Sequence, residues 1–372
     1  MPRIDELLDR LGKAKFVTTI DLAKGYWQVP MAEKDRPKTA FVTPDGLFQF
    51  KVMPFGLNGA PATFQRMMDN VVRGLQDFTA VYLDDIVIYS ETWEEHLQHI
   101  RLTLQRLREG NLTAKPSKCQ FGKKECIYLG HKIGNGEVKP DQEKISAVTS
   151  YPEPKTKKQV RGFLGLTGYY RKFIQNYAEK AAPLTDLTKK KLPDKVTWTK
   201  ECERAFKTLK TALCQTPILR SPDFDKNFIL QTDASDIGIG AVLSQLDEEG
   251  QDYPLAYYSR KLLPREQKYS TVEKECLAIK LAVEHFKIYL LGKPFTIHTD
   301  HRSLKWLNSF KDKNGRLTRW SLSLQPYVFD VMHKAGIKNG NADALSRIST
   351  DNVNDMSVAG EGGRSVKVQD QD

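Results

Sequence analysis

The pattern of apolar and polar positions divides the chain into two regions that mix strands with helices and a helical region between them. In the first region, FVTTIDL (16–22) predicts a strand and Ala60–Gly74 predicts a helix. A second helix is predicted in WEEHLQHIRLTLQRLREGNL (93–112), where Gly110 ends the run. Its apolar side chains recur at helical spacing: Leu97, Ile100, Leu104 and Leu107.

His96 and His99 lie one turn apart on that second helix. Two histidines on one face can contribute to a zinc site, but such a site needs further ligands, and none is near in the sequence. We therefore expect a surface pair of histidines and no metal site.

The helical region, 138–190, is punctuated by prolines, and KKKLPDKVTW (189–198) has the composition of a linker. A further helix is predicted at Glu201–Leu213, followed by a Pro-rich junction. From Asn227 the pattern changes to the alternation of strands, in NFILQTDAS, GIGAVLSQL and YPLAYYSRK.

The last region continues with a long amphipathic helix, TVEKECLAIKLAVEHFKIYLLG, and then a strand, PFTIHTD. Another helix, a strand at YVFDVMH and a closing helix at ADALSR complete the pattern. The tail from Ser349 is polar and rich in glycine, which predicts disorder.

The run AVYLDDIVIYS (80–90) is typical of a buried strand, but it has two carboxylates in its middle. Alternation on a strand would send one of them into an apolar core, where an unpaired charge costs several kcal/mol. Two short strands, Val81–Leu83 and Ile86–Tyr89, joined by a tight turn at Asp84 and Asp85, avoid that cost. Both carboxylates would then project from one tip, as a divalent metal requires. An ordinary Asp-rich hairpin turn is the alternative.

Composition sets few limits on the function. Of 372 residues, 40% are hydrophobic and 28% are charged, as in ordinary globular proteins. No apolar run approaches membrane-spanning length, and the first residues have no apolar signal core. The five cysteines are odd in number and form no CxxC pair, which favours a reducing compartment over a disulfide scaffold.

The net charge of +11 is concentrated in the middle of the chain. Residues 139–210 contain 17 Lys and Arg residues against 8 Asp and Glu residues, and aromatic side chains lie among them. Such a surface suits a phosphate backbone, although a solvated helical surface has the same composition. We expect nucleic-acid contacts from four of its basic residues: Lys155, Lys157, Lys158 and Arg161.

Carboxylates stand at the ends of predicted elements in both halves of the chain. In the first half, Asp21 ends the strand 16–22 and is a candidate third ligand beside Asp84 and Asp85. In the second half, the candidates are Asp233, Glu275, Asp300 and Asp343, although Asp343 is also a typical helix-start residue and Asp300 a typical turn residue. Oxygen ligands of this kind suit two Mg²⁺ ions at each site. The first group would serve nucleotidyl transfer, and the second would activate water against a phosphodiester.

Several motifs of the first half, in this order, resemble the reverse transcriptase of Ty3/gypsy-type retrotransposons: IDLAKGYWQVPM, FQFKVMPFGLNGAPATFQRMMD, VYLDDIVIYS, KCQFGKKECIYLGHKI and VRGFLGLTGYYRKFI. Motifs of the second half resemble the ribonuclease H domain fused to that enzyme: QTDASDIGIGAVLSQ, YSTVEKECLAI, HTDHRSLKWL and NGNADALSR. The resemblance runs from about Pro2 to Arg347.

The resemblance implies a multidomain α+β and α/β fold, with a ferredoxin-like palm, a thumb and a ribonuclease H-like mixed sheet. The implied boundaries are 1–137 for the palm, 138–190 for the thumb, 191–222 for a connection, 223–348 for the ribonuclease H-like domain and 349–372 for the tail.

The resemblance also implies roles for individual residues. Asp21, Asp84 and Asp85 match the polymerase metal ligands, and Asp233, Glu275, Asp300 and Asp343 match those of the nuclease. Tyr26 matches the aromatic residue beneath the sugar of the incoming nucleotide, with Phe55 and Gly56 in the loop beside it. Leu129, Gly130 and His131 resemble the primer grip. His333, expected in a strand-to-helix loop, matches a histidine thought to help product release or proton transfer.

The implied cofactor is Mg²⁺ or Mn²⁺, with two ions at each active site. The implied partners are an RNA template, a DNA primer, RNA–DNA hybrid and dNTPs, together with other Gag and Pol products and no membrane. The implied location is a cytoplasmic virus-like particle, with a nuclear stage. Oligomeric state does not follow from the sequence.

In this family a fingers segment with basic residues precedes the first motif, and this chain begins with Met at that point. We therefore expect a piece of a Pol polyprotein or a truncated gene model, with most of the fingers absent and weak DNA synthesis. Two alternatives stay open: ribonuclease H activity alone, and a domesticated element that binds nucleic acid without catalysis. Intact carboxylates at all seven positions count against decay.

Overall fold

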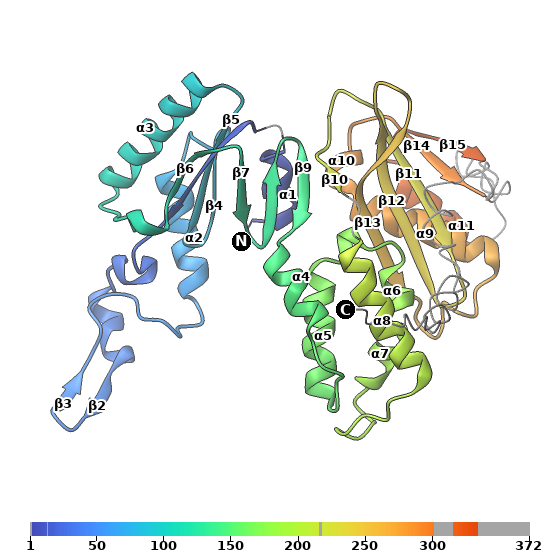
Figure 1. The fold of residues 1–372 in the computed structure, drawn as a ribbon, viewed down its shortest axis with the longest axis horizontal. Coiled ribbons are helices and arrows are strands. Elements are labelled where there is room, and N and C mark those ends of the chain that lie inside the picture. The colour runs from blue at the N-terminus through green and yellow to red at the C-terminus, as the bar shows by residue number, and fades with distance from the viewer. Residues whose placement is uncertain (1, 13, 216–217, 301–314, 334–372) are drawn as a thin grey trace, which may run out of the picture.

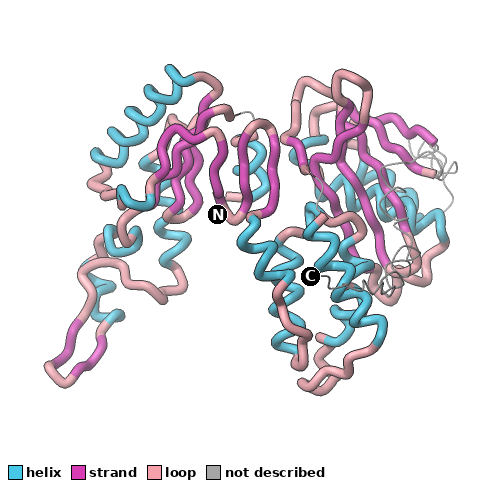
Figure 2. Tube along the Cα trace, viewed as in Figure 1, coloured by secondary structure: helices cyan, strands magenta, loops and turns pink. Residues whose placement is uncertain are grey.

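The structure is a computed structural model, and it describes residues 2–12, 14–215, 218–300 and 315–333. Its strands form three larger sheets and one separate hairpin, with helices packed on the sheets (Figures 1 and 2). None of the described helices has both the length and the apolar character needed to cross a membrane. The predicted closing helix at ADALSR and the tail from Ser349 lie outside the described residues.

The first sheet has the strand order β4-β5-β1-β6. Its strands are β1 (Phe16–Asp21), β4 (Thr79–Tyr82), β5 (Asp85–Ser90) and β6 (Gln120–Lys123), and its helices are α1 (Ile4–Arg10), α2 (Ala60–Val71) and α3 (Trp93–Glu109). Both faces of β5 are buried: Ile86 and Ile88 pack in the core that includes α2, and Val87 packs in the core that includes α1. This double burial explains the continuous apolar run, and the predicted strand 16–22, helix 60–74 and hairpin are confirmed as elements.

Short elements connect β1 to α2. They are the 3₁₀ helices η1 (Gly25–Gln28) and η2 (Glu33–Thr39) and the hairpin of β2 (Phe41–Thr43) with β3 (Gly46–Phe48). This hairpin projects away from the first sheet in Figure 1. Its side chains Val42 and Leu47 are largely exposed.

Helix α3 packs on the first sheet through a face that differs from the predicted apolar stripe. Leu97 and Leu104 are exposed, whereas His96, Thr103 and Leu107 are buried. The reason is that polar side chains of the sheet face this helix, so hydrogen-bonding residues fill the contact. A Thr92–Glu95 capping box begins the helix.

The expected surface pair of histidines is wrong. His96 is fully buried, with its Nε2 atom 2.8 Å from Thr18 Oγ1 and its Nδ1 atom 2.9 Å from Ser90 Oγ. His99 is half-buried, stacks on Phe78 at 3.8 Å between ring centroids, and places its Nδ1 atom 2.8 Å from the same serine oxygen. Burial lowers the pKa of both rings, so both are neutral structural residues.

The second sheet has the order β10-β9-β8-β7. Its strands are β7 (Glu125–Tyr128), β8 (His131–Gly134), β9 (Glu137–Pro140) and β10 (Leu219–Arg220), and η3 (Pro116–Lys118) precedes β6. The helical region that follows contains α4 (Gln142–Thr149), α5 (Lys157–Tyr169), η4 (Arg171–Phe173), α6 (Tyr177–Lys180), α7 (Ala182–Leu187) and α8 (Lys200–Cys214). One core joins this region to α1 and the second sheet, with Leu8, Ile133, Phe163 and Leu209 fully buried in it.

The third sheet is mixed, with the order β13-β12-β11-β14-β15. Its strands are β11 (Phe228–Ala234), β12 (Gly238–Leu246), β13 (Asp252–Lys261), β14 (Phe295–Thr299) and β15 (Phe329–His333), and its helices are α9 (Thr271–His285), α10 (Lys287–Leu290) and α11 (Gly315–Leu324). Strands β14 and β15 run parallel to β11, whereas β12 and β13 alternate in direction. The predicted strands and the long helix of this region are confirmed, although the helix is broken at Phe286.

The helical region and the third sheet are in direct contact. A Cβ atom built on Gly240 would lie 2.1 Å from Asn176 Oδ1, so a larger residue here would displace that side chain, where α6 approaches β12. Ser259 Oγ accepts a hydrogen bond of 2.9 Å from the Ala178 amide, and Lys261 Nζ lies 2.7 Å from Asp186 Oδ1. The two parts are therefore packed together along β12 and β13.

Candidate active sites

The two-residue loop between β4 and β5 lies one residue earlier in the sequence than predicted. Tyr82 pairs with Asp85, so the two-residue loop is Leu83-Asp84 and Asp85 begins β5. Leu83 has a positive φ of 55°, which a two-residue hairpin loop requires. Asp84 is thus at the tip and Asp85 is on the strand.

Asp21 and Asp85 face each other across neighbouring strands. The antiparallel register of β1 and β5 pairs these two residues directly. Like charges in this position are destabilising unless a cation lies between or beside them. Lys118, from η3, supplies one: its Nζ atom is 3.1 Å from Asp21 Oδ2.

Asp84 completes a group of three carboxylates. Burial raises its pKa, and the charges of Asp85 and Asp21 raise it further. Burial and Asp21 likewise raise the pKa of Asp85. The buried Oδ1 atom of Asp84 has no hydrogen-bond partner within the described part of the chain. An electron-rich, unpartnered oxygen beside two more carboxylates is a good fit to a divalent cation.

Two further residues, neither of them predicted from the sequence, support the position of Asp84 and its turn. A Cβ atom on Gly25 would lie 2.1 Å from Asp84 Oδ1, so this glycine makes room for the carboxylate. Gln65, on α2, is buried; its Oε1 atom accepts a 2.8 Å hydrogen bond from the Leu83 amide, and its Nε2 atom donates to the Val81 carbonyl at 3.1 Å. The position of Gly25, four residues after Asp21 and directly before the aromatic Tyr26, could have indicated its role.

Tyr26 and Phe55 lie beside the first carboxylate group. Their rings are 5.4 Å apart, and Tyr26 also contacts Phe64 at 5.3 Å. Burial raises the pKa of Tyr26, and the charge of Asp84 raises it further. Gly56 follows with φ of 92°, a left-handed conformation that favours glycine. The structure thus brings Tyr26 and Phe55 into ring contact, with Gly56 next to Phe55 in the chain.

Leu129 and Gly130 form the turn between β7 and β8, both with positive φ. Their carbonyl oxygens accept hydrogen bonds from the hydroxyls of Tyr169 (2.6 Å) and Tyr170 (2.7 Å). His131 is buried, and its Nδ1 atom donates to the Leu129 carbonyl at 2.7 Å. The turn is therefore fastened to the helical region, and His131 does not face solvent.

One of the four predicted basic contacts is wrong. Lys157 is buried, and its ammonium group donates to the carbonyl of Leu192, so it holds the 189–198 loop and does not reach a phosphate. The reason is its position at the start of α5, on the side that the loop covers. Lys155, Lys158 and Arg161 remain exposed.

The second group of carboxylates lies at one end of the third sheet. Gln231 of β11 is registered with His298 of β14, so Asp233 and Asp300, each two residues further along these parallel strands, end at the same level. Glu275, on α9, reaches this edge, and its Oε1 atom accepts a 3.2 Å hydrogen bond from the Ala234 amide. The structure thus brings three of the four predicted residues together.

Glu275 is the most perturbed member of this group. Burial raises its pKa to about 8, and the charges of Asp233 and Asp300 add to the effect. Loss of solvent and the charge of Asp300 also raise the pKa of Asp233. Glu275 Oε2 is buried and finds no hydrogen-bond partner among the described residues. This oxygen, like that of Asp84, fits a cation.

Asp343, the fourth predicted ligand, lies outside the described residues. His333 is the last residue of β15, paired with Thr299, which precedes Asp300. The expected place in a strand-to-helix loop is therefore corrected to the end of a strand, because pairing with β14 continues through this residue. In the described ranges, no three His, Cys, Asp or Glu side chains stand close enough to hold a metal ion as they lie.

Comparisons with known proteins agree with this division of the chain. Residues 1–133 match the family described as reverse transcriptase (RNA-dependent DNA polymerase), and residues 223–327 match the RNase H-like domain found in reverse transcriptase. The chain is 47% identical over 350 residues to the retrovirus-related Pol polyprotein from transposon 297 of Drosophila melanogaster. The match covers 94% of this chain and 32% of that protein, so the chain spans about a third of that relative's length.

Solved structures show the same fold. The foamy viral protease-reverse transcriptase dRH in complex with double-stranded DNA superposes with a TM-score of 0.79 and 23% identity, over 90% of this chain and 59% of that chain. The foamy viral protease-reverse transcriptase in complex with RNA/DNA hybrid superposes with a TM-score of 0.75 and 22% identity, over 99% of this chain and 48% of that chain. At these identities the likeness concerns the fold alone.

Proposed function

Because this chain joins a reverse transcriptase domain to the RNase H-like domain found in reverse transcriptase, as retrotransposon Pol polyproteins do, we propose that it works on RNA and DNA at two sites. At the first site it extends a DNA primer on an RNA template with dNTPs. At the second it cuts the RNA strand of the resulting hybrid.

The observation that supports this proposal is the same at both sites. Each has a buried carboxylate oxygen with no partner among the described residues, Asp84 Oδ1 at one and Glu275 Oε2 at the other, beside further carboxylates. Asp21, Asp84 and Asp85 would hold Mg²⁺ or Mn²⁺ at the first site, and Asp233, Glu275 and Asp300 at the second. When bound, two such ions supply activation of the attacking oxygen and stabilisation of the leaving one.

Other residues of the first site bind and orient the substrate. The tilted rings of Tyr26 and Phe55 offer an apolar wall against which a sugar ring can lie. Lys118, which is paired with Asp21, has to move when a metal ion takes that carboxylate. Its ammonium group is then free to face the phosphates of the nucleotide.

The second site depends on keeping Glu275 ionised. In the absence of a cation its raised pKa favours the protonated carboxyl group near neutral pH. A bound cation reverses that preference, because it stabilises the charged form. The backbone amide of Ala234 fixes the orientation of this side chain through its bond to Oε1.

Nucleic acid is the proposed common substrate. The foamy viral structures contain double-stranded DNA and RNA/DNA hybrid, and their folds extend over most of this chain. Lys155, Lys158 and Arg161 are exposed on the helical region, where they can meet a phosphate backbone.

The experiment uses the full chain with a labelled primer on an RNA template, and separately with a preformed RNA–DNA hybrid, each with Mg²⁺. We expect the pair Asp84→Asn with Asp85→Asn to lose extension and keep cleavage, and Asp300→Asn to lose cleavage and keep the fold. The amides retain shape and remove the charge that binds metal. Cleavage at the parent rate in Asp300→Asn would refute the second site, and cleavage without any extension by the parent would leave a nuclease only.

A further inference from the structure

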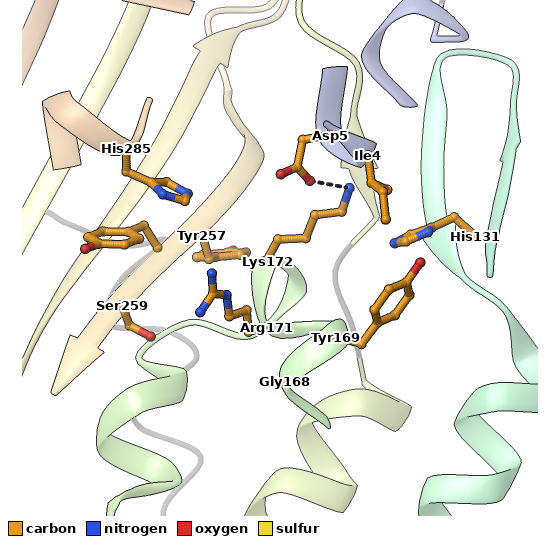
Figure 3. A pocket seen from close by; sticks show the side chains of 11 residues that line it. Ile4, Asp5, His131, Gly168, Tyr169, Arg171, Lys172, Tyr257, Ser259 and His285 are labelled. Atoms are coloured by element: carbon orange, nitrogen blue, oxygen red, sulfur yellow. Dashed lines mark ion pairs between the residues drawn. The ribbon is translucent and has the colours of Figure 1, made fainter. Parts of the chain in front are cut away.

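A cavity of about 260 Å³ lies where three parts of the chain meet, and neither carboxylate group lines it. Ile4 and Asp5 of α1 border it on one side, η4 of the helical region below, and Tyr257–Ser259 of β13 on the other (Figure 3). It is smaller than the roughly 300–1,000 Å³ of sites for drug-sized ligands, so one or two fused rings would fill it.

The walls of the cavity are largely aromatic. Tyr169, Tyr257 and Tyr258 line it together with His285, whose ring stacks on Tyr258 at 4.3 Å between centroids. Burial, together with the nearby charge of Arg171, lowers the pKa of His285 to about 4. This histidine is therefore a neutral ring near pH 7 and contributes a flat surface with no charge.

The charges around the cavity do not balance. Lys172 is paired with Asp5 at 3.5 Å, as the dashed line in Figure 3 marks. The neighbouring Arg171 guanidinium is exposed, lies near the ring of Tyr257 in Figure 3, and forms no ion pair with any carboxylate that the structure describes. Burial lowers the pKa of His131 to about 3, so this residue adds no charge. Among the described residues that line the cavity, Arg171 is therefore a positive charge without a paired carboxylate.

We propose that this cavity binds a small aromatic carboxylate, with the acid group on Arg171 and the ring system between Tyr257, Tyr258 and Tyr169. A guanidinium can hold a carboxylate by two parallel hydrogen bonds, a geometry that a point charge lacks. Tyrosine faces and edges favour offset stacking with an aromatic ring. The combination selects for an anion with a flat apolar body.

Such a ligand would join two parts of the molecule. Arg171 belongs to the helical region, and Tyr257 and Tyr258 belong to the third sheet, so a bound ligand contacts both. Because it binds only the packed arrangement, it should raise the temperature at which the chain unfolds.

The experiment is isothermal titration of the full chain with 2-naphthoate, and with the neutral 2-naphthamide as the matched probe. We expect saturable binding of one naphthoate per chain, a rise in the unfolding temperature, and at least roughly tenfold weaker binding of the amide, since a charge-assisted contact is lost. Arg171→Met should weaken naphthoate binding by a similar factor. Ile4→Phe, which fills the cavity and keeps Arg171, should abolish it.

The control is Arg204→Met, on an exposed arginine of α8 away from the cavity, which should bind as the parent does. Circular dichroism and the unfolding temperature show whether each variant is folded. Equal binding by the parent, Arg171→Met and Ile4→Phe, or no saturable binding by the parent, would overturn the proposal. So would displacement of naphthoate by a short RNA–DNA hybrid that itself binds Arg171→Met poorly, because Arg171 would then belong to a phosphate-backbone contact.

Discussion

At the scale of single residues, a glycine at position 25 matters to the first site as much as the carboxylates themselves. Gly25 faces Asp84 so closely that any Cβ atom would lie 2.1 Å from Oδ1 and 2.9 Å from the ring of Phe64. The phenylalanine is fully buried and cannot move aside. The carboxylate would have to leave its position above the turn.

We therefore expect Gly25→Ala to lower primer extension by about a hundredfold, since misplacement of a reacting group by about 1 Å has that effect. Cleavage of a preformed hybrid should be unchanged, because the second site is on another sheet. Gly59→Ala is the matched control, as a Cβ atom there meets nothing within 4 Å. Steady-state extension rates measure the difference, and an unimpaired Gly25→Ala enzyme would contradict the geometry.

At the scale of elements, α3 is attached to the first sheet by hydrogen bonds as well as by apolar contact. Ser90 Oγ lies within 2.9 Å of two imidazole nitrogens, and Thr18 Oγ1 within 2.8 Å of one and 3.0 Å of the Gly122 amide. Each hydroxyl is buried, so each requires these partners.

His96→Leu should accordingly destabilise the chain by about 1–3 kcal/mol in total, because Thr18 and Ser90 each lose one of their two hydrogen-bond partners. Leu97→Ala, on the neighbouring exposed position, should change the stability little. Urea unfolding followed by tryptophan fluorescence compares the two variants, because Trp93 is at the start of the same helix. A larger loss in Leu97→Ala than in His96→Leu would show that the apolar stripe is the packed face after all.

At the scale of the whole molecule, a half-buried acid, Asp9, lies between the first helix and the last domain. Asp9 of α1 accepts a hydrogen bond from the hydroxyl of Tyr289, on α10. Burial raises the pKa of Asp9 to about 6, against the lowering effects of Tyr289 and Lys172. The neutral carboxyl group is therefore favoured in the folded chain more than in the unfolded one.

The sign of the pH dependence follows from that shift. Below about pH 4 Asp9 is protonated in both states; between about pH 4 and 6 the unfolded state ionises first, so stability falls as pH rises and then levels off. Asp9→Asn keeps an acceptor for Tyr289 and removes the titration, so it should flatten this part of the curve. Unfolding temperatures from pH 4 to 7, at constant ionic strength, test it; parallel curves for parent and variant would exclude Asp9 as the source.

The strands and helices, and the candidate acids, can be predicted from the sequence alone. The YLDD turn follows from the cost of burying a carboxylate in an apolar strand, and β11 to β15 with α9 follow from periods of two and of about 3.6 residues. The candidate acids Asp21, Asp84, Asp85, Asp233, Glu275 and Asp300 follow from motifs in the sequence, without knowledge of their neighbours in space. Such patterns depend only on residues that are close together in the sequence, so they can be recognised without knowledge of the tertiary structure.

Contacts between residues that are far apart in the sequence follow from the tertiary structure alone. His96 is buried because Thr18 and Ser90 face it. Lys157 is not available to a phosphate because its ammonium group donates to the carbonyl of Leu192. Gly25 and Asp84, 59 residues apart, become contacts through the pairing of β1 with β5. Burial, pKa and the cavity at Arg171 depend on which surfaces the packing brings together, and no single stretch of sequence specifies that.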